Sequence, residues 1–306
     1  MGRKNKMKSK NTNENVESRT LVHSAFDVAR SLQIATLIVQ ADELRDIRLV
    51  GRLRESEHVI WLTRHEADLP IAISSNDAVL RLPEATLTRM SQLKVGLLLA
   101  VMNTLVDLDE SVVCLSGVAG SERLDTLLIA NAGRDYPWFR NGNIADIQGL
   151  FSSREVARIL EIALRLAAEG REGKPIGTVL VLGDESKLEP YCRQLVLNPF
   201  KGHPQRERSI HSQEFFETIR EFSGLDGGFI VSRKGTVLSA GTYFDAGVKK
   251  IRLRPGLGAR HAAAQSITSV TDAIAFAISA SSGTVTVFHD GRPILELERP
   301  ERTSHI

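Results

Sequence analysis

The sequence has few features that would tie it to a membrane or to an oxidising compartment. Its 306 residues contain no apolar run approaching the roughly 20 residues needed to cross a bilayer. The start, MGRKNKMKSKNTNENVESR, has basic residues but no apolar core, which is unlike a secretory signal. Cys114 and Cys192 lie far apart and outside any CxxC pair, which argues against a disulfide framework or a zinc site. These absences favour a cytoplasmic protein with no membrane partner.

The chain also lacks an excess of one charge outside its first residues. The formal net charge is +2. Residues 1–19 carry six Lys/Arg and two Asp/Glu, which leaves 33 basic and 35 acidic residues for the rest. The composition of residues 1–19 predicts a disordered, basic, solvated tail. The remaining sequence gives no reason to expect a nucleic-acid partner.

Short apolar runs alternate with helical patterns over residues 20–135. Helical spacing recurs over 21–32, 43–53 and 83–106, and the apolar runs typical of buried strands are 34–39, 58–63, 111–117 and 125–131. This alternation predicts a first domain with a parallel α/β sheet, in which Cys114 is buried. Residues 136–150 are richer in Gly, Asn and aromatics and are interpreted as a connector.

The pattern over residues 151–306 predicts a mixed sheet with helices on its faces. Ser153 suits the N-cap of an amphipathic helix, and an apolar run over 178–184 predicts a strand. The final third consists mostly of strand patterns, with turns at Arg233–Gly235, Ser282–Gly283 and Asp290–Gly291. The fold class is therefore α/β with two domains.

The stretch GLGARHAAAQSITSVTDA, which begins at Gly256, places Arg260 and His261 directly before a helix-favouring run. Free N–H groups and the helix dipole at such a position favour anions. Two interpretations follow from these residues alone: an exposed basic helix start, or a phosphate site.

Three motifs, in this order, resemble those of the diadenylate cyclase (DAC) domain. They are Asp-Gly-Gly at Asp226–Gly228, Arg-His-Ala at Arg260–Ala262 and Ser-Ala-Ser-Ser-Gly at Ser279–Gly283. The family has Asp-Gly-Ala, Arg-His-Arg and a Ser-containing turn. The upstream segments GREGKPIGTVLVLGD and RQLVLNPF resemble those leading into this domain in archaeal-type cyclases. In those proteins a pyruvate-kinase C-terminal-like α/β domain comes first, and residues 20–135 are similar to it.

The resemblance implies an enzyme that condenses two ATP molecules into the second messenger cyclic di-AMP and two pyrophosphates. Each 3′-hydroxyl attacks the α-phosphorus of the other ATP, so two DAC domains must pair face to face in at least a homodimer. It also implies Mn²⁺ or Mg²⁺ as cofactor, with Asp226 as metal ligand and activator of the 3′-hydroxyl. Arg260 and His261 would contact the triphosphate.

The resemblance further implies a set of ATP-binding positions, with Tyr243 beside Phe244 as a second aromatic candidate for adenine. These positions are Gly227, Gly228, Phe244, Gly258, Ala259, Arg260, His261, Ala262, Ala263 and Ser279. Each has an ordinary structural alternative: a turn glycine, a core aromatic, a strand-end serine or, for Asp226, a turn or cap residue.

Two positions depart from the family pattern. Gly228 replaces alanine, which we expect to be harmless because both residues leave the backbone room to approach a nucleotide. Ala262 replaces the second arginine and so removes one cationic side chain that could contact the phosphates. A non-catalytic nucleotide sensor therefore remains the alternative function. In the first domain, the loop after the strand at 34–39 reads ADELRD, without the Thr-Ser-Gly-like effector loop of pyruvate kinases. A structural or oligomerising role is therefore expected for that domain, with regulation by an unidentified ligand as the alternative.

Overall fold

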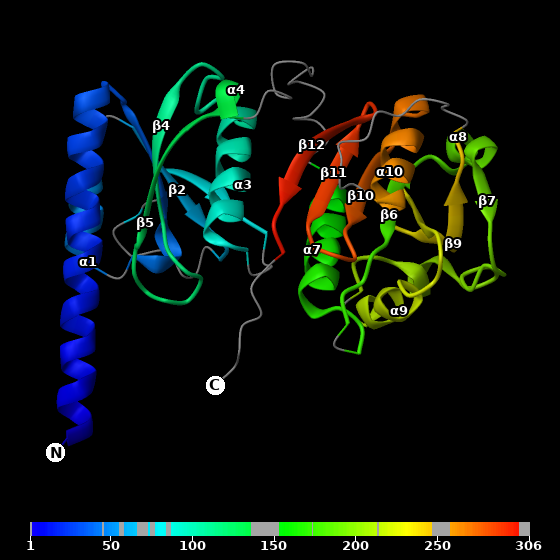
Figure 1. The fold of residues 1–306 in the computed structure, drawn as a ribbon, viewed down its shortest axis with the longest axis horizontal. Coiled ribbons are helices and arrows are strands. Elements are labelled where there is room, and N and C mark those ends of the chain that lie inside the picture. Colours follow the sequence, from blue (N-terminus) through cyan, green and yellow to red (C-terminus); the bar gives the residue numbers. More distant parts are fainter. Residues whose placement is uncertain are drawn as a thin grey trace. The chain divides into compact units, whose positions relative to one another are not determined.

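The computed structural model describes residues 2–44, 46–54, 58–65, 73, 77–83, 87–135, 153–172, 174–212, 214–246 and 258–299. The chain divides into two compact units, Met1–Gln148 and Gly149–Ile306, which are described one at a time (Figure 1). The connector expected over 136–150 and the glycine Gly256 lie outside the described residues.

The N-terminal unit is built on a five-stranded sheet with the order β3-β2-β1-β4-β5. Its strands are β1 (Thr36–Gln40), β2 (His58–Thr63), β3 (Ala78–Arg81), β4 (Ser111–Ser116) and β5 (Thr126–Asn131). Strands β1 to β4 are parallel, and β5 is antiparallel to β4. The chain moves outward from β1 to β3 and then returns to the other side of β1. The carboxyl ends of β1 and β4 therefore mark the point where the strand order reverses.

Helices cover both faces of this sheet, with α1 and α3 on opposite sides of it (Figure 1). The helices are α1 (Gly2–Leu32), α2 (Ile47–Leu53), α3 (Arg89–Met102) and α4 (Ala132–Asp135), and a 3₁₀ turn spans Ala41–Glu43. On one face, Val22 and Ala25 of α1 pack into a core with Val50 of α2 and the buried Trp61 of β2.

The predicted parallel α/β arrangement is confirmed, with differences in detail. Strand β3 was not expected, because only four residues form it and their burial is incomplete. Helix α3 begins at Arg89 rather than near Pro83, since the Oγ1 of Thr88 caps it by accepting the N–H of Ser91.

Helix α1 also differs from the sequence-based expectation of a disordered tail over residues 1–19. The helix begins at Gly2 and continues without a break into the part that packs on the sheet. Residues 3–19 contain no proline or glycine and several good helix formers, so nothing in them stops a helix that the core anchors further along. No described helix is both long and apolar enough to span a membrane.

The C-terminal unit has a seven-stranded mixed sheet with the order β12-β11-β10-β6-β8-β9-β7. Its strands are β6 (Val179–Gly183), β7 (Cys192–Gln194), β8 (Gly228–Ser232), β9 (Val237–Phe244), β10 (Ile274–Ile278), β11 (Val285–His289) and β12 (Arg292–Leu297). Only β6 and β8 are parallel neighbours; the other neighbouring pairs are antiparallel.

Two longer helices, with two short ones, cover this second sheet. They are α7 (Arg154–Glu169), α8 (Glu185–Leu188), α9 (Phe215–Phe222) and α10 (Ala259–Val270). Ala264 and Ile267 of α10 pack into a core with alternate residues of β6 and β10, such as Val179 and Ala277. The residues between them, such as Leu180, are also buried, and α7 packs against the same two strands.

The mixed α/β character predicted for the second half is confirmed. The Oγ of Ser153 accepts the N–H groups of Glu155 and Val156 at the start of α7, as expected of an N-cap. The three expected turns each join a pair of consecutive antiparallel strands from β8 to β12. Cys114 and Cys192 are free, and burial raises the pKa of the Cys114 thiol to about 12.

Candidate functional site

The three motif segments come together at one edge of the C-terminal sheet. The parallel strands β6 and β8 begin at this edge, and their antiparallel neighbours β10 and β9 end there. Asp226 and Gly227 therefore precede β8, which starts at Gly228, while Phe244 ends β9 and Ser279 follows β10. Four adjacent strands place at this edge residues that are up to about 50 positions apart in the sequence.

Gly227 and Gly228 of the first motif each require glycine, but for different structural reasons. Gly227 has φ of +95°, in the left-handed region that favours glycine. At Gly228 the limit is space: a Cβ would lie 2.5 Å from the carbonyl oxygen of Val179 and 2.9 Å from Cε2 of Phe244. An alanine methyl group would not fit at position 228 of this chain without a shift of β6 or of the Phe244 ring. The expectation that glycine here is harmless to nucleotide binding stays a prediction.

The two aromatic candidates at the end of β9 differ in exposure. Phe244 is 5% exposed and belongs to the core beneath α10. Tyr243 is 45% exposed, and the guanidinium carbon of Arg193 lies 5.5 Å from its ring centre. Of the two rings, only that of Tyr243 is open to solvent, so contact of adenine with Phe244 stays a prediction.

Asp226 is exposed, and its carboxylate forms no hydrogen bond or ion pair with the other described residues. Within the described part of the chain, no three His, Cys, Asp or Glu side chains lie close enough to hold a metal ion together. A single carboxylate nevertheless fits Mg²⁺, which commonly takes one or two carboxylates and completes its shell with phosphate oxygens and water. Asp226 could serve as that ligand if the nucleotide supplies the rest.

Helix α10 begins directly after Gly258, which is extended, with φ −82° and ψ −176°. Gly258 and Ala259 are exposed, and Ala262 and Ala263 are half-buried. The first N–H groups of a helix have no acceptor inside it, so those of Ala259 and Arg260 suit an anion.

Arg260 and His261 are adjacent but take up different positions. The Nε of Arg260 donates to the carbonyl oxygen of Gly177 at 2.6 Å, just before β6. His261 is 4% exposed, its Nε2 lies 3.2 Å from Oγ1 of Thr286, and its ring meets that of Phe288 edge-on. The structure therefore brings Arg260 to the strand edge and turns His261 into the core.

The environment of His261 favours the neutral imidazole. Burial lowers its pKa, and the charge of Glu296 opposes that shift only in part. Its contacts suit the role of holding α10 against β11. Direct contact of His261 with a triphosphate stays a prediction.

The turn after β10 presents a row of hydroxyl groups. The Oγ of Ser279 lies 3.1 Å from that of Ser281 and accepts the N–H of Ser282 at 3.3 Å. The Oγ of Ser282 in turn donates to Oγ1 of Thr284 at 2.8 Å. Ser281 and Ser282 are exposed, which leaves the turn accessible at the same edge as Asp226.

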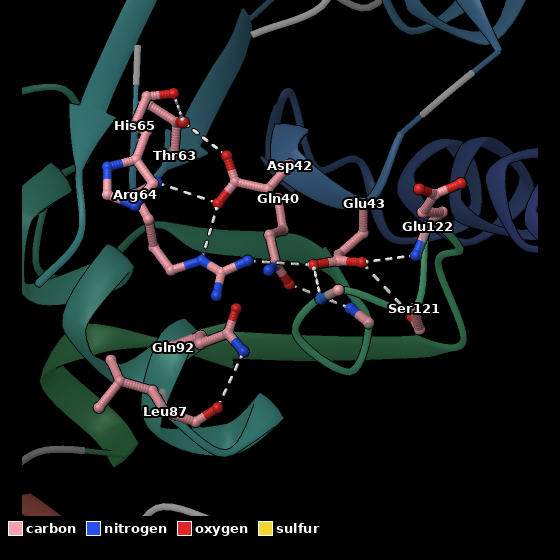
Figure 2. Close-up of polar contacts among 12 residues, drawn as sticks. Gln40, Asp42, Glu43, Thr63, Arg64, His65, Leu87, Gln92, Ser121 and Glu122 are labelled. Atoms are coloured by element: carbon pink, nitrogen blue, oxygen red, sulfur yellow. Dashed lines mark hydrogen bonds and ion pairs between the residues drawn. The ribbon is translucent and has the colours of Figure 1, made fainter. Parts of the chain in front are cut away.

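A second polar cluster lies in the N-terminal unit, at the carboxyl ends of β1 and β2 (Figure 2). Glu43 is 1% exposed, and its carboxylate accepts the backbone N–H groups of Gly120 at 2.7 Å and Glu122 at 2.8 Å. Arg64 bridges Glu43 and Asp42, with Nη2 3.4 Å from Glu43 and Nε 3.1 Å from Asp42.

This second cluster is largely satisfied by the chain itself. Asp42 also accepts the hydroxyl of Thr63 and, at 3.0 Å, the backbone N–H of Arg64. Burial raises the pKa of Glu43, although the two backbone N–H groups and Arg64 act in the opposite direction. Three buried side-chain atoms of the same unit lack a hydrogen-bond partner within the described residues: Gln40 Nε2, Gln92 Oε1 and Ser116 Oγ.

Comparison with known proteins matches the second unit to a nucleotide-binding domain. The model of the DAC family, described as "DisA bacterial checkpoint controller nucleotide-binding", matches residues 165–293, which include all three motifs. A diadenylate cyclase of Methanocaldococcus jannaschii is 36% identical over 177 residues, or 58% of this chain and 56% of that protein. A diadenylate cyclase of Haloferax volcanii is 31% identical over 205 residues, or 65% of this chain and 72% of that protein.

The chain belongs to the diadenylate cyclase family. This confirms the resemblance to archaeal-type cyclases that the motifs carry. The match to the Methanocaldococcus protein spans little more than half of that protein's length.

Two solved structures are also similar. One is a hypothetical membrane-spanning protein from Bacillus cereus, with a TM-score of 0.38, 19% identity, and coverage of 54% of this chain and 75% of that one. The other is a double mutant of DacA from Staphylococcus aureus, with a TM-score of 0.35, 23% identity, and coverage of 47% and 89%. Both TM-scores are low, and no argument rests on them.

Proposed function

We propose that this protein is a diadenylate cyclase that condenses two ATP molecules into cyclic di-AMP and two pyrophosphates. The observation that carries the proposal is the meeting of the three motif segments at one sheet edge, inside the region that the family matches. Relatives named diadenylate cyclase, at 36% and 31% identity, support the same reaction.

In the proposed reaction, the 3′-oxygen of each ATP forms a bond to the α-phosphorus of the other. The bond from that phosphorus to the oxygen that bridges it to the β-phosphate breaks and releases pyrophosphate, and the proton of each 3′-hydroxyl passes to the Asp226 carboxylate and from there to solvent. We assign to Asp226 the orientation of the 3′-hydroxyl; its exposed carboxylate, which has no partner among the described residues, supports this assignment. It is also the residue that would hold Mn²⁺ or Mg²⁺, which would neutralise charge on the phosphates.

Binding of the triphosphate is assigned to the start of α10. Arg260 offers guanidinium N–H groups beyond the one that it donates to Gly177, and the first N–H groups of the helix add to them. The exposed serine turn at Ser279 lies at the same edge, and the backbone at Gly227 and Gly228 is the proposed adenine contact. The remaining site assignments, Phe244, Gly258, Ala259, His261, Ala262 and Ala263, are part of the same proposal.

The reaction needs two such edges to face each other, because each ATP is both attacker and target. The proposed assembly is therefore a homo-oligomer, at least a dimer, that pairs the second units in a cytoplasmic protein. We assign the DAC domain to residues 151–306, and to 20–135 a pyruvate-kinase C-terminal-like domain with a structural or oligomerising role.

A non-catalytic nucleotide sensor is the alternative, and Ala262 is the observation that favours it. The family has an arginine there, whereas this chain has a half-buried methyl group on the first turn of α10. One fewer cation beside the phosphates reduces stabilisation of the charge that develops during transfer.

The test is product formation by the purified full chain. We expect incubation with ATP and either Mn²⁺ or Mg²⁺ to yield cyclic di-AMP, detected by mass spectrometry, and pyrophosphate in a 2:1 ratio to it. ATP binding without product under both metals would overturn the cyclase proposal and leave the sensor. Omission of the metal is expected to abolish product formation.

A further inference from the structure

Three segments of the C-terminal unit converge on Gly177, a residue that the motifs do not include. Gly177 lies just before β6 and is buried. Its carbonyl oxygen accepts the Nε–H of Arg260 at 2.6 Å, from the first turn of α10. The nearest atoms on another side belong to Ala280, in the turn that follows β10. The residue thus touches both the proposed phosphate arginine and the serine turn.

The absence of a side chain is what permits this approach. A Cβ at Gly177 would lie 2.8 Å from Cβ of Ala280, 3.0 Å from its backbone nitrogen and 3.1 Å from Cδ of Arg260. The first distance is shorter than real Cβ contacts allow, and the second lies at that limit. Gly177 is not among the glycines with positive φ, so space, rather than backbone conformation, requires glycine here.

The backbone around Gly177 is also fixed. The next carbonyl, that of Thr178, accepts the N–H of Ile278 at 2.9 Å, where β10 ends beside β6. The Gly177 carbonyl therefore cannot follow Arg260 if the arginine moves. It acts as a stationary acceptor at the sheet edge.

The hydrogen bond determines which part of the guanidinium remains for a ligand. A guanidinium has five N–H donors in a rigid, planar fork. With Nε–H held by Gly177, the two terminal nitrogens remain as a pair that matches two oxygens of a phosphate. No other hydrogen bond or ion pair joins the Arg260 side chain to the described residues.

We propose that Gly177 is a positioning residue for nucleotide binding: its carbonyl orients Arg260 and its lack of a side chain lets α10 and the serine turn close on the same phosphates. This inference rests on the proposed function, because it takes Arg260 as the triphosphate ligand. It adds a residue outside the three motifs that affects ATP binding mainly through Arg260 and, to a smaller extent, through the serine turn at Ala280.

The experiment is a double-mutant cycle between Gly177→Ala and Arg260→Ala in the full chain. The binding readout is the Kd for 3′-deoxy-ATP with Mn²⁺, because this analogue lacks the attacking hydroxyl and reports binding without turnover. We expect Gly177→Ala to raise this Kd about tenfold, as for loss of one well-placed charged hydrogen bond. In the Arg260→Ala background, the same change should raise it by less than about threefold, because the added Cβ then meets only Ala280 of the serine turn. The KM for ATP should rise with the Kd, and kcat should change less.

Gly51→Ala is the matched control, because a Cβ there meets nothing within 4 Å and Gly51 lies in α2 of the other unit. It should leave the Kd unchanged. An equal rise in Kd from Gly177→Ala in both backgrounds, or no rise in either, overturns the proposal. Failure of the unmutated chain to bind the analogue overturns it as well. Binding without cyclic di-AMP formation overturns only the proposed function, since the cycle is still decided by the Kd.

Arg260→Lys covers the case in which Gly177→Ala does not fold. Lysine keeps the charge but has no Nε–H to donate to the Gly177 carbonyl in this geometry. The proposal requires a Kd close to that of Arg260→Ala. A Kd equal to that of the unmutated chain overturns it.

Discussion

In the N-terminal unit, the charged side chains of Asp42, Glu43 and Arg64 after the strand ends are bound by other parts of the same chain. In the C-terminal unit, the carboxylate of Asp226 at the candidate site has no such partner among the described residues. Glu43 is buried and accepts two backbone N–H groups of a loop that follows β4, with Arg64 beside it (Figure 2). Asp226 is exposed and has no partner among the described residues, and Arg260 uses one N–H on the backbone. Each edge carries at least one carboxylate and an arginine, so residue type alone does not separate them.

The role of a charged residue can be assigned from whether its hydrogen-bonding groups already have partners inside the protein. A carboxylate whose lone pairs are already occupied inside the protein contributes to stability, and removing it leaves donors unpaired. A carboxylate with open lone pairs at a strand edge is available to a substrate or a metal ion. The comparison predicts that substitutions at one edge change stability and those at the other change activity.

The largest expected effect is that of Asp226→Asn on cyclic di-AMP formation. The amide keeps the shape but cannot take the proton or hold the metal as an anion, so we expect the rate to fall on the order of 100-fold or more. The thermal midpoint should stay the same, because the carboxylate has no partner among the described residues. Activity that persists undiminished would refute the assignment of Asp226.

Glu43→Ala is the corresponding substitution at the other edge. It removes the acceptor of the N–H groups of Gly120 and Glu122 and a partner of Arg64, and it empties the buried volume of the Glu43 side chain. We expect the free energy of unfolding of the N-terminal unit to fall by about 3 kcal/mol, measured by urea denaturation. Glu17→Ala, at an exposed ion pair with Arg123, is the control and should change it by less than about 1 kcal/mol. Equal effects of the two substitutions would contradict the interpretation that Glu43 stabilises the N-terminal unit through its internal hydrogen bonds.

The two units should also respond to pH in opposite directions. The pKa of Glu43 is raised in the folded protein, so the part of the stability that is linked to its protonation is complete below its ordinary value of 4.5 and is lost as the pH rises through the folded pKa. The pKa of His261 is lowered, so its contribution is complete above its ordinary value of 6.5 and is lost as the pH falls through the folded pKa. The free energy of unfolding of each unit, measured by hydrogen exchange between about pH 4 and about pH 8, tests the direction of both pH dependences.

Single variants isolate these two contributions. Glu43→Gln should flatten the acid-side dependence of the N-terminal unit, and His261→Gln should flatten that of the C-terminal unit. A C-terminal unit that gains stability as the pH falls below 6.5, and does so only with His261 present, would show that the imidazole is not desolvated as in this structure.

The smallest expected effect is a stabilisation by Ser116→Ala. The Oγ of Ser116 is buried without a hydrogen-bond partner among the described residues, and alanine removes it with little change in shape. We expect the N-terminal unit to gain about 1 kcal/mol, seen as a higher denaturation midpoint with an unchanged m-value. A loss of stability instead would mean that the hydroxyl is satisfied, for example by an internal water.

Local sequence patterns predicted most of the strands and turns, but they did not predict the order of the strands in each sheet. The turns at Gly235, Gly283 and Gly291 and the apolar runs of β6 and β10 are readable because each signal lies within a few neighbouring residues. The short β3 carries too few residues for such a signal. Sheet order depends on contacts between distant segments and has no comparable local signature.

The same limit applies to the candidate site. The motifs at Asp226 and Arg260 are recognisable in the sequence because each consists of three consecutive residues. Gly177 was overlooked because its partner Arg260 is 83 positions away, and its neighbours made it look like a plain lead-in to β6. The crowding at Gly228 has no local signal either, because Val179 and Phe244, which fill the space beside it, lie on other strands.

The carboxylate of Glu43 occupies a place in the N-terminal unit that could otherwise bind a free anion. The N–H groups of Gly120 and Glu122 form a small anion receptor, and the chain supplies the anion from only a short tether after β1. A tethered group acts at an effective concentration on the order of millimolar or above. A free phosphate or carboxylate compound at lower concentration therefore loses the competition for this receptor unless Glu43 is protonated or removed.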